Sequence, residues 1–154
     1  MAPRDANRLR TIAAIFASLA FFAATKVHAA TFHAQGCTIT GTSGPDILFG
    51  TPGRDVICGL AGNDRIDGTG GNDVLIGGLG ADLIGGGGGN DVIYGGPGND
   101  RLQGDSGDDT VYGGAGRDTI WAWDGFADRL NGGAGMDRAW KDKLDSVRLV
   151  ERFA

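Results

Sequence analysis

The stretch that decides the fold is GGPGNDRLQ, residues 95–103, because its pattern returns along most of the chain. An aspartate occurs every nine residues, with glycine two and five positions before it and an aliphatic residue two positions after it. The aspartates in strict register are Asp46, Asp55, Asp64, Asp73, Asp82, Asp91, Asp100, Asp109 and Asp118. One extra residue near Phe126 shifts the phase, and the pattern resumes at Asp128 and Asp137. A short fixed period of this kind indicates a repeat architecture over residues 41–140.

Each nonapeptide predicts a turn of six residues followed by a strand of three. Glycine allows the backbone conformations that tight turns need, and side chains alternate between the two faces of a strand. The aliphatic residues therefore point inward, and they are Leu48, Ile57, Ile66, Leu75, Ile84, Ile93, Leu102, Val111 and Ile120. Two nonapeptides make one coil of 18 residues, and successive coils stack at the strand spacing of roughly 4.8 Å. We predict an all-β fold, a parallel β-roll (β-solenoid).

Coiling of this kind stacks every second aspartate into one of two columns. One column runs from Asp46 to Asp118 and the other from Asp55 to Asp109. Adjacent carboxylates about 5 Å apart repel by roughly 3 kcal/mol at an effective dielectric near 20. Solvated turn aspartates would carry this penalty at every step, whereas a cation between each pair would convert repulsion into attraction. We therefore predict metal sites along both columns.

Calcium is the predicted ion. Aspartate oxygens and glycine carbonyls suit a hard cation that takes 6–8 oxygen ligands, whereas magnesium prefers a tighter octahedron. Zinc and copper prefer cysteine or histidine, and after signal cleavage only His33 remains as a histidine. The gaps in the two columns predict about seven regular Ca2+ sites, with looser ones near Phe126. The predicted ligands are Asp46, Asp55, Asp64, Asp73, Asp82, Asp91, Asp100, Asp109, Asp118, Asp128 and Asp137.

The nonapeptide resembles the G-G-x-G-x-D-x-U-x repeat, with U aliphatic, of the RTX (repeats-in-toxin) calcium-binding family. The resemblance implies a calcium-binding β-roll, and in that family calcium-coupled folding is linked to secretion in unfolded form. The chain departs from the pattern where the second glycine is replaced, at Thr42, Thr51, Leu60, Thr69, Asp105 and Trp123. That family usually leaves the cell by an uncleaved C-terminal signal, so the N-terminal signal predicted below is a further difference.

Residues 1–29 predict a cleaved secretory signal peptide, because a basic start precedes an apolar run of about 14 residues and a small-residue end. A retained membrane anchor is the alternative, but spanning a bilayer takes roughly 20 residues. We predict an N-terminal cap at residues 30–40 and a C-terminal cap at residues 141–154. Ser146–Phe153 is expected to form a final strand. The aromatic residues near the phase shift are expected to cover the open end, and a carbohydrate-stacking or partner-binding patch is the alternative; these residues are Trp121, Trp123, Phe126 and Trp140.

Signal cleavage would change the formal net charge from −5 to −8, because it removes Arg4, Arg8, Arg10, Lys26 and Asp5. Such an acidic chain argues against nucleic acid or anionic lipid as its main partner and favours cations. No second apolar run of that kind follows, so we expect no membrane insertion after cleavage. We predict an exported protein, extracellular or periplasmic.

Cys37 and Cys58 are the only cysteines. An even number in an oxidising compartment allows one disulfide. Two buried thiols are the alternative.

The apolar core alone is too small to fix this fold. Ordering nine residues costs on the order of 9–18 kcal/mol of backbone entropy, whereas one buried aliphatic side chain contributes about 1.5–3 kcal/mol. We therefore predict that the chain folds on binding calcium and that its role is structural or calcium-buffering. The alternative is a calcium-rigidified adhesion or ligand-binding module at the cell surface. Its outward face, which could also mediate self-association, would carry Val56, Val74, Val92, Ile76, Tyr94 and Tyr112.

We predict that the protein is not an enzyme. The segment GDSGD at residues 104–108 looks like the nucleophile segment of trypsin-like proteases, but it lies in register with the repeat. A catalytic triad also needs a histidine base, and His33 precedes the repeats. Neither G-x-S-x-G nor H-E-x-x-H occurs in the sequence.

Overall fold

A computed structural model of the chain describes residues 36–148 and 152–153. The predicted signal peptide, residues 1–29, lies outside the described residues, and so do parts of both predicted caps. Every described element is a β-strand. None of the described residues belongs to a helix that could cross a bilayer.

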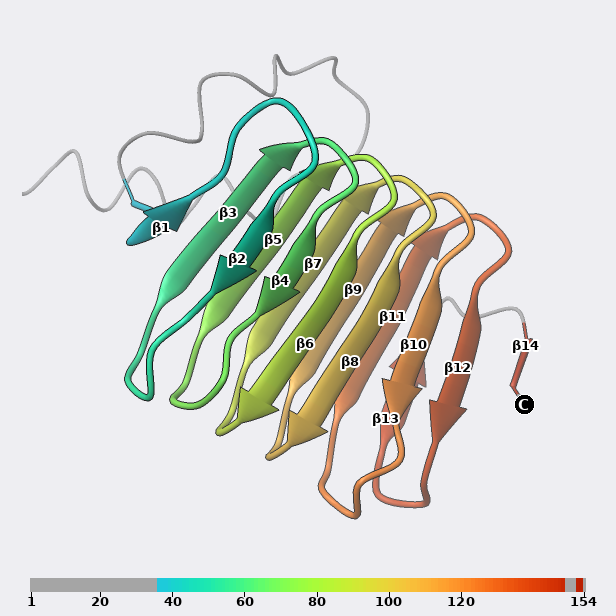
Figure 1. Cartoon of the computed structure of the whole chain (residues 1–154). Coiled ribbons are helices and arrows are strands. Elements are labelled where there is room, and N and C mark those ends of the chain that lie inside the picture. The colour runs from blue at the N-terminus through green and yellow to red at the C-terminus, as the bar shows by residue number, and fades with distance from the viewer. Residues whose placement is uncertain (1–35, 149–151, 154) are drawn as a thin grey trace, which may run out of the picture.

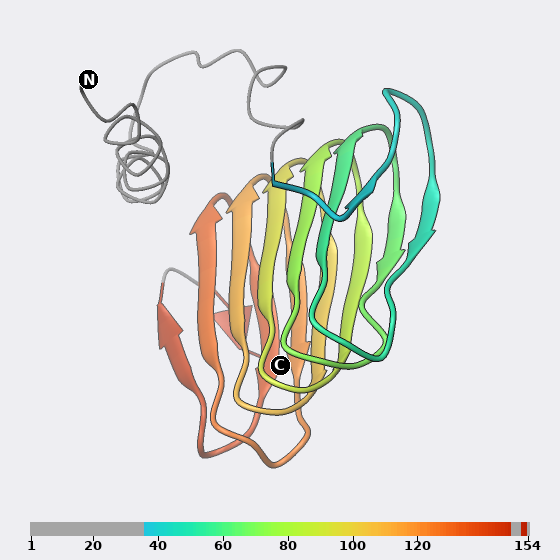
Figure 2. The same ribbon diagram turned by 90° about the vertical axis from the view of Figure 1, so that its left-hand side faces the viewer.

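The strands form two parallel sheets of seven strands each, and consecutive strands alternate between them (Figure 1). The first sheet, in spatial order, contains β1 (Ile39–Thr40), β3 (Val56–Ala61), β5 (Val74–Leu79), β7 (Val92–Pro97), β9 (Thr110–Ala115), β11 (Arg129–Ala134) and β13 (Ser146–Arg148). The second contains β14 (Arg152–Phe153), β12 (Arg138–Lys141), β10 (Thr119–Ala122), β8 (Arg101–Ser106), β6 (Leu83–Gly88), β4 (Arg65–Asp67) and β2 (Ile47–Phe49). The chain therefore winds as a flattened coil, which Figure 2 shows from another side.

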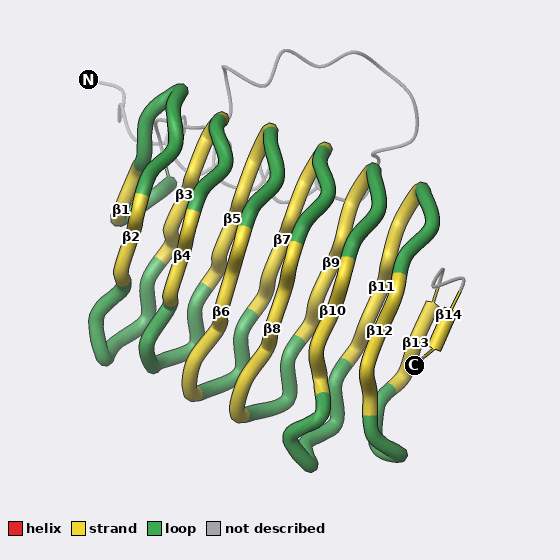
Figure 3. The backbone as a smooth tube through the Cα atoms, turned by 45° about the vertical axis from the view of Figure 1, so that its right-hand side comes forward, coloured by secondary structure: helices red, strands yellow, loops and turns green. Residues whose placement is uncertain are grey.

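The register confirms the predicted coil of two nonapeptides. Leu75 pairs with Ile93 and Ile93 pairs with Val111, each 18 residues further along the chain. Across the phase shift Val111 pairs with Leu130, 19 residues on, so the extra residue is absorbed without a break in the ladder. The turns form two rows, one along each edge of the roll (Figure 3).

The interior is lined by two ladders of aliphatic side chains, one from each sheet, as the period-two alternation predicted. The inward residues from Ile57 to Ile120 are at most 1% exposed, and after the phase shift Leu130 and Ala139 continue the ladders. At the first coil Ile39 and Leu48 are only partly buried, because no further coil of described residues packs against them. The core therefore contains one aliphatic side chain from each sheet per coil and is as long as the roll.

The strands are longer than predicted. Seven of them, β3, β5, β6, β7, β8, β9 and β11, have six residues instead of three. The parallel pairing continues past the aliphatic residue into the glycine pair of the next repeat, as in the pairs Gly96 with Gly114 and Pro97 with Ala115. Glycine has no side chain to disturb the close approach, so the ladder runs into what the sequence pattern marked as a turn.

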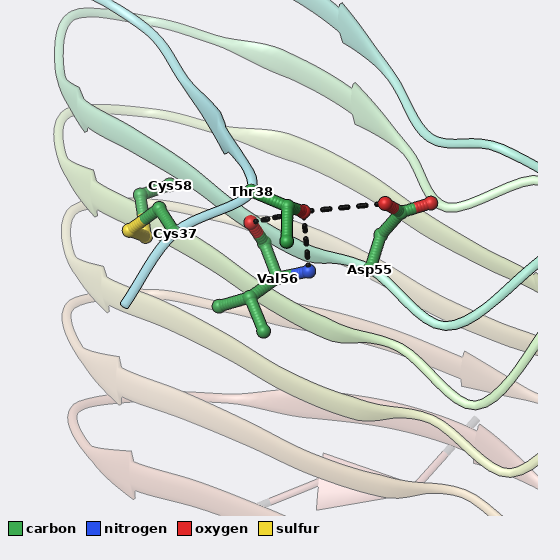
Figure 4. Close-up of a disulfide and its surroundings, with 5 residues drawn as sticks. All are labelled: Cys37, Thr38, Asp55, Val56 and Cys58. Atoms are coloured by element: carbon green, nitrogen blue, oxygen red, sulfur yellow. Dashed lines mark hydrogen bonds between the residues drawn. A yellow bond between two sulfur atoms is a disulfide. The ribbon is translucent and has the colours of Figure 1, made fainter. Parts of the chain in front are cut away.

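A disulfide between Cys37 and Cys58 fastens the N-terminal segment to the first sheet (Figure 4). Next to it the Thr38 hydroxyl accepts the N–H of Val56 at 2.9 Å and lies 3.2 Å from Asp55 Oδ1, to which it donates. The disulfide prediction is confirmed. Together these bonds hold residues 37–40 over the first coil.

The C-terminal end differs from the prediction in two ways. Ser146–Phe153 does not form one strand, since Ser146–Arg148 joins the first sheet and Arg152–Phe153 joins the second. Trp121 and Trp140 pair across β10 and β12 and stack with ring centroids 5.5 Å apart on the outer face, because they are one residue beyond the inward positions. They extend the row of outward-facing side chains on the second sheet and do not cover the end of the core.

Candidate metal centre

The repeat aspartates form two rows, one at each edge of the roll, as predicted. In each row the backbone N–H of one aspartate donates to Oδ1 of the aspartate one coil further on. The bond from Asp46 to Asp64 measures 2.9 Å and the bond from Asp91 to Asp109 measures 2.7 Å. The first row is Asp46, Asp64, Asp82, Asp100, Asp118 and Asp137, and the second is Asp55, Asp73, Asp91, Asp109, Asp128 and Asp145.

Only one oxygen of each carboxylate is used in this way. In the described part of the chain the other oxygen, Oδ2, is buried and has no hydrogen-bond partner in ten aspartates. These are Asp64, Asp73, Asp82, Asp91, Asp100, Asp109, Asp118, Asp124, Asp128 and Asp137. An unpaired buried polar atom is costly, and a buried charge more so. Each Oδ2 atom therefore needs either a proton or a cation.

The glycine at the start of most turns lies where a second oxygen comes close to Oδ2. A Cβ added to Gly95 would lie 2.5 Å from Asp100 Oδ2 and 2.6 Å from the carbonyl oxygen of Gly113. At Gly41 the corresponding distances are 2.8 Å to Asp46 Oδ2 and 2.7 Å to the carbonyl oxygen of Gly59. A carboxylate and a carbonyl from the next coil thus converge on a space that only glycine leaves free.

Burial raises the pKa of the aspartates in the middle of the roll. Loss of solvation is the largest cause, and neighbouring carboxylates add to it, whereas the backbone N–H from the preceding coil opposes it. The pKa rises to about 7 at Asp100 and to about 8 at Asp109. The charges that raise these two pKa values come from other aspartates. The protonation of these two carboxyl groups therefore changes near neutral pH.

The first two turns are built differently. Thr42 and Thr51 occupy the second repeat position, and each donates twice to Oδ2 of its own turn. The N–H and hydroxyl of Thr51 lie 2.7 and 2.8 Å from Asp55 Oδ2, and those of Thr42 lie 2.6 and 2.9 Å from Asp46 Oδ2. The backbone N–H of Thr51 and then its hydroxyl lower the pKa of Asp55.

Backbone geometry separates the same two turns from the others. From the third turn onward, most residues at the second position adopt positive φ, including the non-glycine residues Leu60 (81°), Thr69 (70°) and Asp105 (65°). Thr42 and Thr51 do not adopt this conformation. The side chain alone therefore does not decide the difference, because Thr69 is also a threonine and donates to the carbonyl oxygen of Thr51 instead.

The structure adds two aspartates that the sequence pattern missed. Asp145 continues the second row, and the following residues Ser146 and Val147 repeat the aspartate-x-aliphatic signal that could have identified it. Asp124 lies outside the repeat, in the turn that contains the extra residue. Its carboxylate lies near those of Asp109 and Asp128, with one oxygen of each within 4.8 Å of the others.

The ligand set fits calcium. The convergent atoms are carboxylate and carbonyl oxygens, which hard cations with six to eight ligands prefer. Both cysteines are in the disulfide, so neither supplies a thiolate for a softer metal.

Comparison with known protein families gives the same answer. The sequence profile of the RTX calcium-binding nonapeptide repeat (4 copies) matches residues 38–66, 59–93 and 94–126, more than half of the chain. The chain belongs to this family. No curated protein and no solved structure matches it. The RTX assignment predicted from the nonapeptide is confirmed, and with it calcium binding as the general function of these repeats.

Proposed function

We propose that the RTX repeats bind a row of calcium ions along each edge of the roll and that binding completes folding. The observation that supports this most strongly is the series of buried Oδ2 atoms without a hydrogen-bond partner. Six of them are accompanied by a carbonyl oxygen at the same glycine, as at Gly95, which matches the oxygen-rich surroundings that calcium needs; these are Oδ2 of Asp64, Asp73, Asp82, Asp91, Asp100 and Asp118.

The proposed ligands are the aspartates with an unpartnered Oδ2, which include all the predicted ligands except Asp46 and Asp55. At those two residues Thr42 and Thr51 supply hydrogen bonds to Oδ2. We therefore propose that Asp46 and Asp55 contribute least to calcium dependence, and that the regular sites begin with Asp64 and Asp73. The number of regular sites, about seven, stays a prediction.

Coupling between binding and folding follows from the same carboxylates. Without a cation at neutral pH, the folded roll must hold a row of buried carboxylates or take up protons, and both options cost free energy. The unfolded chain avoids this cost because its aspartates are hydrated. Calcium bound only by the folded roll therefore contributes its binding free energy to folding.

We further propose a non-enzymatic role, structural or calcium-buffering, for an exported protein. Folding would then follow arrival in a calcium-rich compartment, because extracellular calcium modules commonly bind with dissociation constants of about 10⁻⁴–10⁻³ M. An adhesion or ligand-binding role remains the second candidate. Its support is the stacked pair Tyr94 and Tyr112, with ring centroids 5.0 Å apart on the outer face of the first sheet.

A calcium titration followed by calorimetry and far-ultraviolet circular dichroism tests the proposal. We expect several calcium ions per chain and a rise in β-signal that saturates with the binding heat. Magnesium at the same concentration serves as the control and should produce little of either. The same β-content with calcium and with chelator would contradict folding on binding. Replacement of Tyr94 and Tyr112 by serine, with loss of cell-surface association but unchanged calcium titration, would favour the second candidate.

A further inference from the structure

The turn between β10 and β11 is the irregular turn of the second row. Ten residues separate Asp118 from Asp128, instead of nine, and the turn carries an aspartate, Asp124, that the nonapeptide pattern does not contain. Hydrogen bonds to both neighbouring turns hold it. The N–H of Ala127 donates to Asp108 at 3.0 Å and the N–H of Gly125 donates to Asp142 at 2.9 Å.

One carboxylate oxygen of Asp124 accepts a hydrogen bond, and the other has no hydrogen-bond partner. Its Oδ1 accepts the N–H of Phe126 at 2.9 Å, which fixes the carboxylate in the turn. Its Oδ2 is buried without a hydrogen-bond partner, although the residue as a whole is only half-buried. The carboxylate is therefore oriented by the backbone and not by a counter-charge.

Two fully buried carboxylates face the same point. Asp109 is 0% exposed and Asp128 is 1% exposed, and the Oδ2 atom of each has no hydrogen-bond partner. One oxygen from each of the three aspartates lies within 4.8 Å of the other two. Each Oδ1 atom of Asp109 and Asp128 already accepts a backbone N–H, so Oδ2 is the atom left to bind a ligand.

We propose that Asp109, Asp124 and Asp128 form a three-carboxylate calcium site that differs from the regular sites of the repeat. This inference rests on the proposed function, because it places a calcium ion in the second row of aspartates. The third carboxylate raises the negative charge at the site, and calcium affinity increases with ligand charge and rigidity. The site fills before the regular ones and fixes the turn that joins β10 to β11.

A matched pair of substitutions tests the assignment. Asp124→Asn removes the charge but keeps an oxygen for the N–H of Phe126. Asp67→Asn is the control, because Asp67 Oδ1 likewise accepts the N–H of the residue two positions on, Thr69, at 3.0 Å, and Asp67 lies outside both rows. We expect Asp124→Asn to weaken the tightest class of calcium binding roughly tenfold or more, while Asp67→Asn leaves it unchanged.

Calorimetric titration of the wild type and both variants gives the readout, and failures of the two proposals are distinguishable. A wild type that binds no calcium overturns the proposed function. If the tightest class of calcium sites has the same affinity in the wild type and in Asp124→Asn, only the three-carboxylate site is overturned. Loss of several sites together in Asp124→Asn, with no change confined to the tight class, also overturns it.

Terbium luminescence provides a second test that does not depend on the Asp124→Asn variant. Trp123 is adjacent to Asp124 in sequence and is 77% exposed, so Trp123→Phe should leave the roll intact. We expect the first terbium ion bound by the wild type to emit under tryptophan excitation, and Trp123→Phe to reduce that early emission. A first terbium ion that shows no tryptophan-sensitised emission in the wild type would lie elsewhere and overturn the proposal.

Discussion

The first two turns and the turns in the middle of the roll have the same nonapeptide pattern, but they stabilise the Oδ2 atom of their aspartate in different ways. At Asp46 and Asp55 the turn itself donates two hydrogen bonds to Oδ2, from the backbone and the hydroxyl of a threonine. At Asp100 and Asp109 no group of the described chain donates a hydrogen bond to Oδ2. The chain thus supplies hydrogen bonds to Oδ2 in its N-terminal turns and leaves Oδ2 of the later turns for a cation.

The disulfide strengthens this contrast. Cys37 and Cys58 join the N-terminal segment to the coil that contains Asp55, and Thr38 donates to that same aspartate. The first coil is thus supported by covalent and hydrogen bonds that need no metal. We expect it to be the part of the roll that depends least on calcium.

The largest expected effect comes from filling the space beside Oδ2 in a middle turn. Gly95→Ala would place a Cβ 2.5 Å from Asp100 Oδ2 and 2.6 Å from the Gly113 carbonyl oxygen. Overpacking of this kind costs typically about 1–3 kcal/mol, and here it also blocks the proposed ligand pair. We expect calcium-induced folding, followed by circular dichroism, to be lost or shifted to much higher calcium.

Gly88→Ala is the matched control for this substitution, because a Cβ there meets no atom within 4 Å. It should behave like the wild type in the same titration. Equal effects of Gly95→Ala and Gly88→Ala would indicate that glycine matters here for backbone flexibility and not for the space beside the carboxylate.

The next effect is a pH dependence with opposite signs in the two regions. In the chelated protein the raised pKa values of Asp100, about 7, and Asp109, about 8, favour the protonated folded form. Their contribution to stability is full below the unfolded pKa of 3.8 and is lost as the pH rises through 7 to 8. Chelated protein should therefore have more β-signal at pH 5 than at pH 8.

The lowered pKa of Asp55 acts in the opposite direction, since its contribution is present above pH 3.8 and is lost as the pH falls through the folded pKa. Circular dichroism of chelated protein between pH 3 and pH 9 measures the sum of these contributions to the stability of the folded form. A chelated β-signal that increases steadily from pH 5 to pH 8 would contradict this account of the middle turns.

A smaller effect separates individual aspartates of the two regions. Asp100→Asn keeps an oxygen for the N–H of Asp82, which donates at 2.9 Å, but removes the charge at Oδ2. We expect the calcium midpoint of folding to rise several-fold, because one site loses a carboxylate. Asp46→Asn should change the midpoint less, since Thr42 already satisfies Oδ2 of Asp46. Equal calcium midpoints for Asp100→Asn and Asp46→Asn would contradict the proposed difference between the middle turns and the first two turns.

The smallest effect is expected at the threonine hydroxyl. Thr51→Ala removes the hydroxyl bond to Asp55 Oδ2 and the weaker bond from the Gly53 N–H to that hydroxyl, at 3.2 Å, and keeps the backbone bond to Oδ2. A loss of about 1 kcal/mol in the free energy of unfolding is expected, because one hydrogen bond contributes typically about 0.5–1.5 kcal/mol and the Gly53 N–H is exposed to water once its partner is lost. Chemical denaturation of the calcium-loaded protein measures it, with Thr110→Ala, on the outer face of β9, as control. A calcium affinity that fell together with stability would instead make Thr51 part of a metal site.

The nine-residue period predicted the coil, the inward aliphatic ladders and the two rows of aspartates, because each depends only on spacing. The six-residue strands could not be predicted in the same way, since they depend on pairing between glycine backbones such as Gly96 and Gly114. The roles of Thr42 and Thr51 were also missed. They departed from the pattern in the same way as Thr69, which has a different backbone conformation.

The candidate site was predicted least well where the spacing changes. Asp145 follows Asp128 by 17 residues and Asp124 has no place in the nonapeptide, so a search by period passes over both. Their positions follow from how the irregular turn packs against its neighbours, through Asp108 and Asp142. This is a property of three adjacent turns and not of any one repeat.

The most direct test of the central claim is an anomalous difference map from crystals grown in calcium. We predict peaks at the unpartnered Oδ2 atoms of the middle turns, from Asp64 and Asp73 onward, and one among Asp109, Asp124 and Asp128. We predict the weakest density, or none, at Asp46 and Asp55. An ordered roll with no calcium peaks along either row of aspartates would contradict the account.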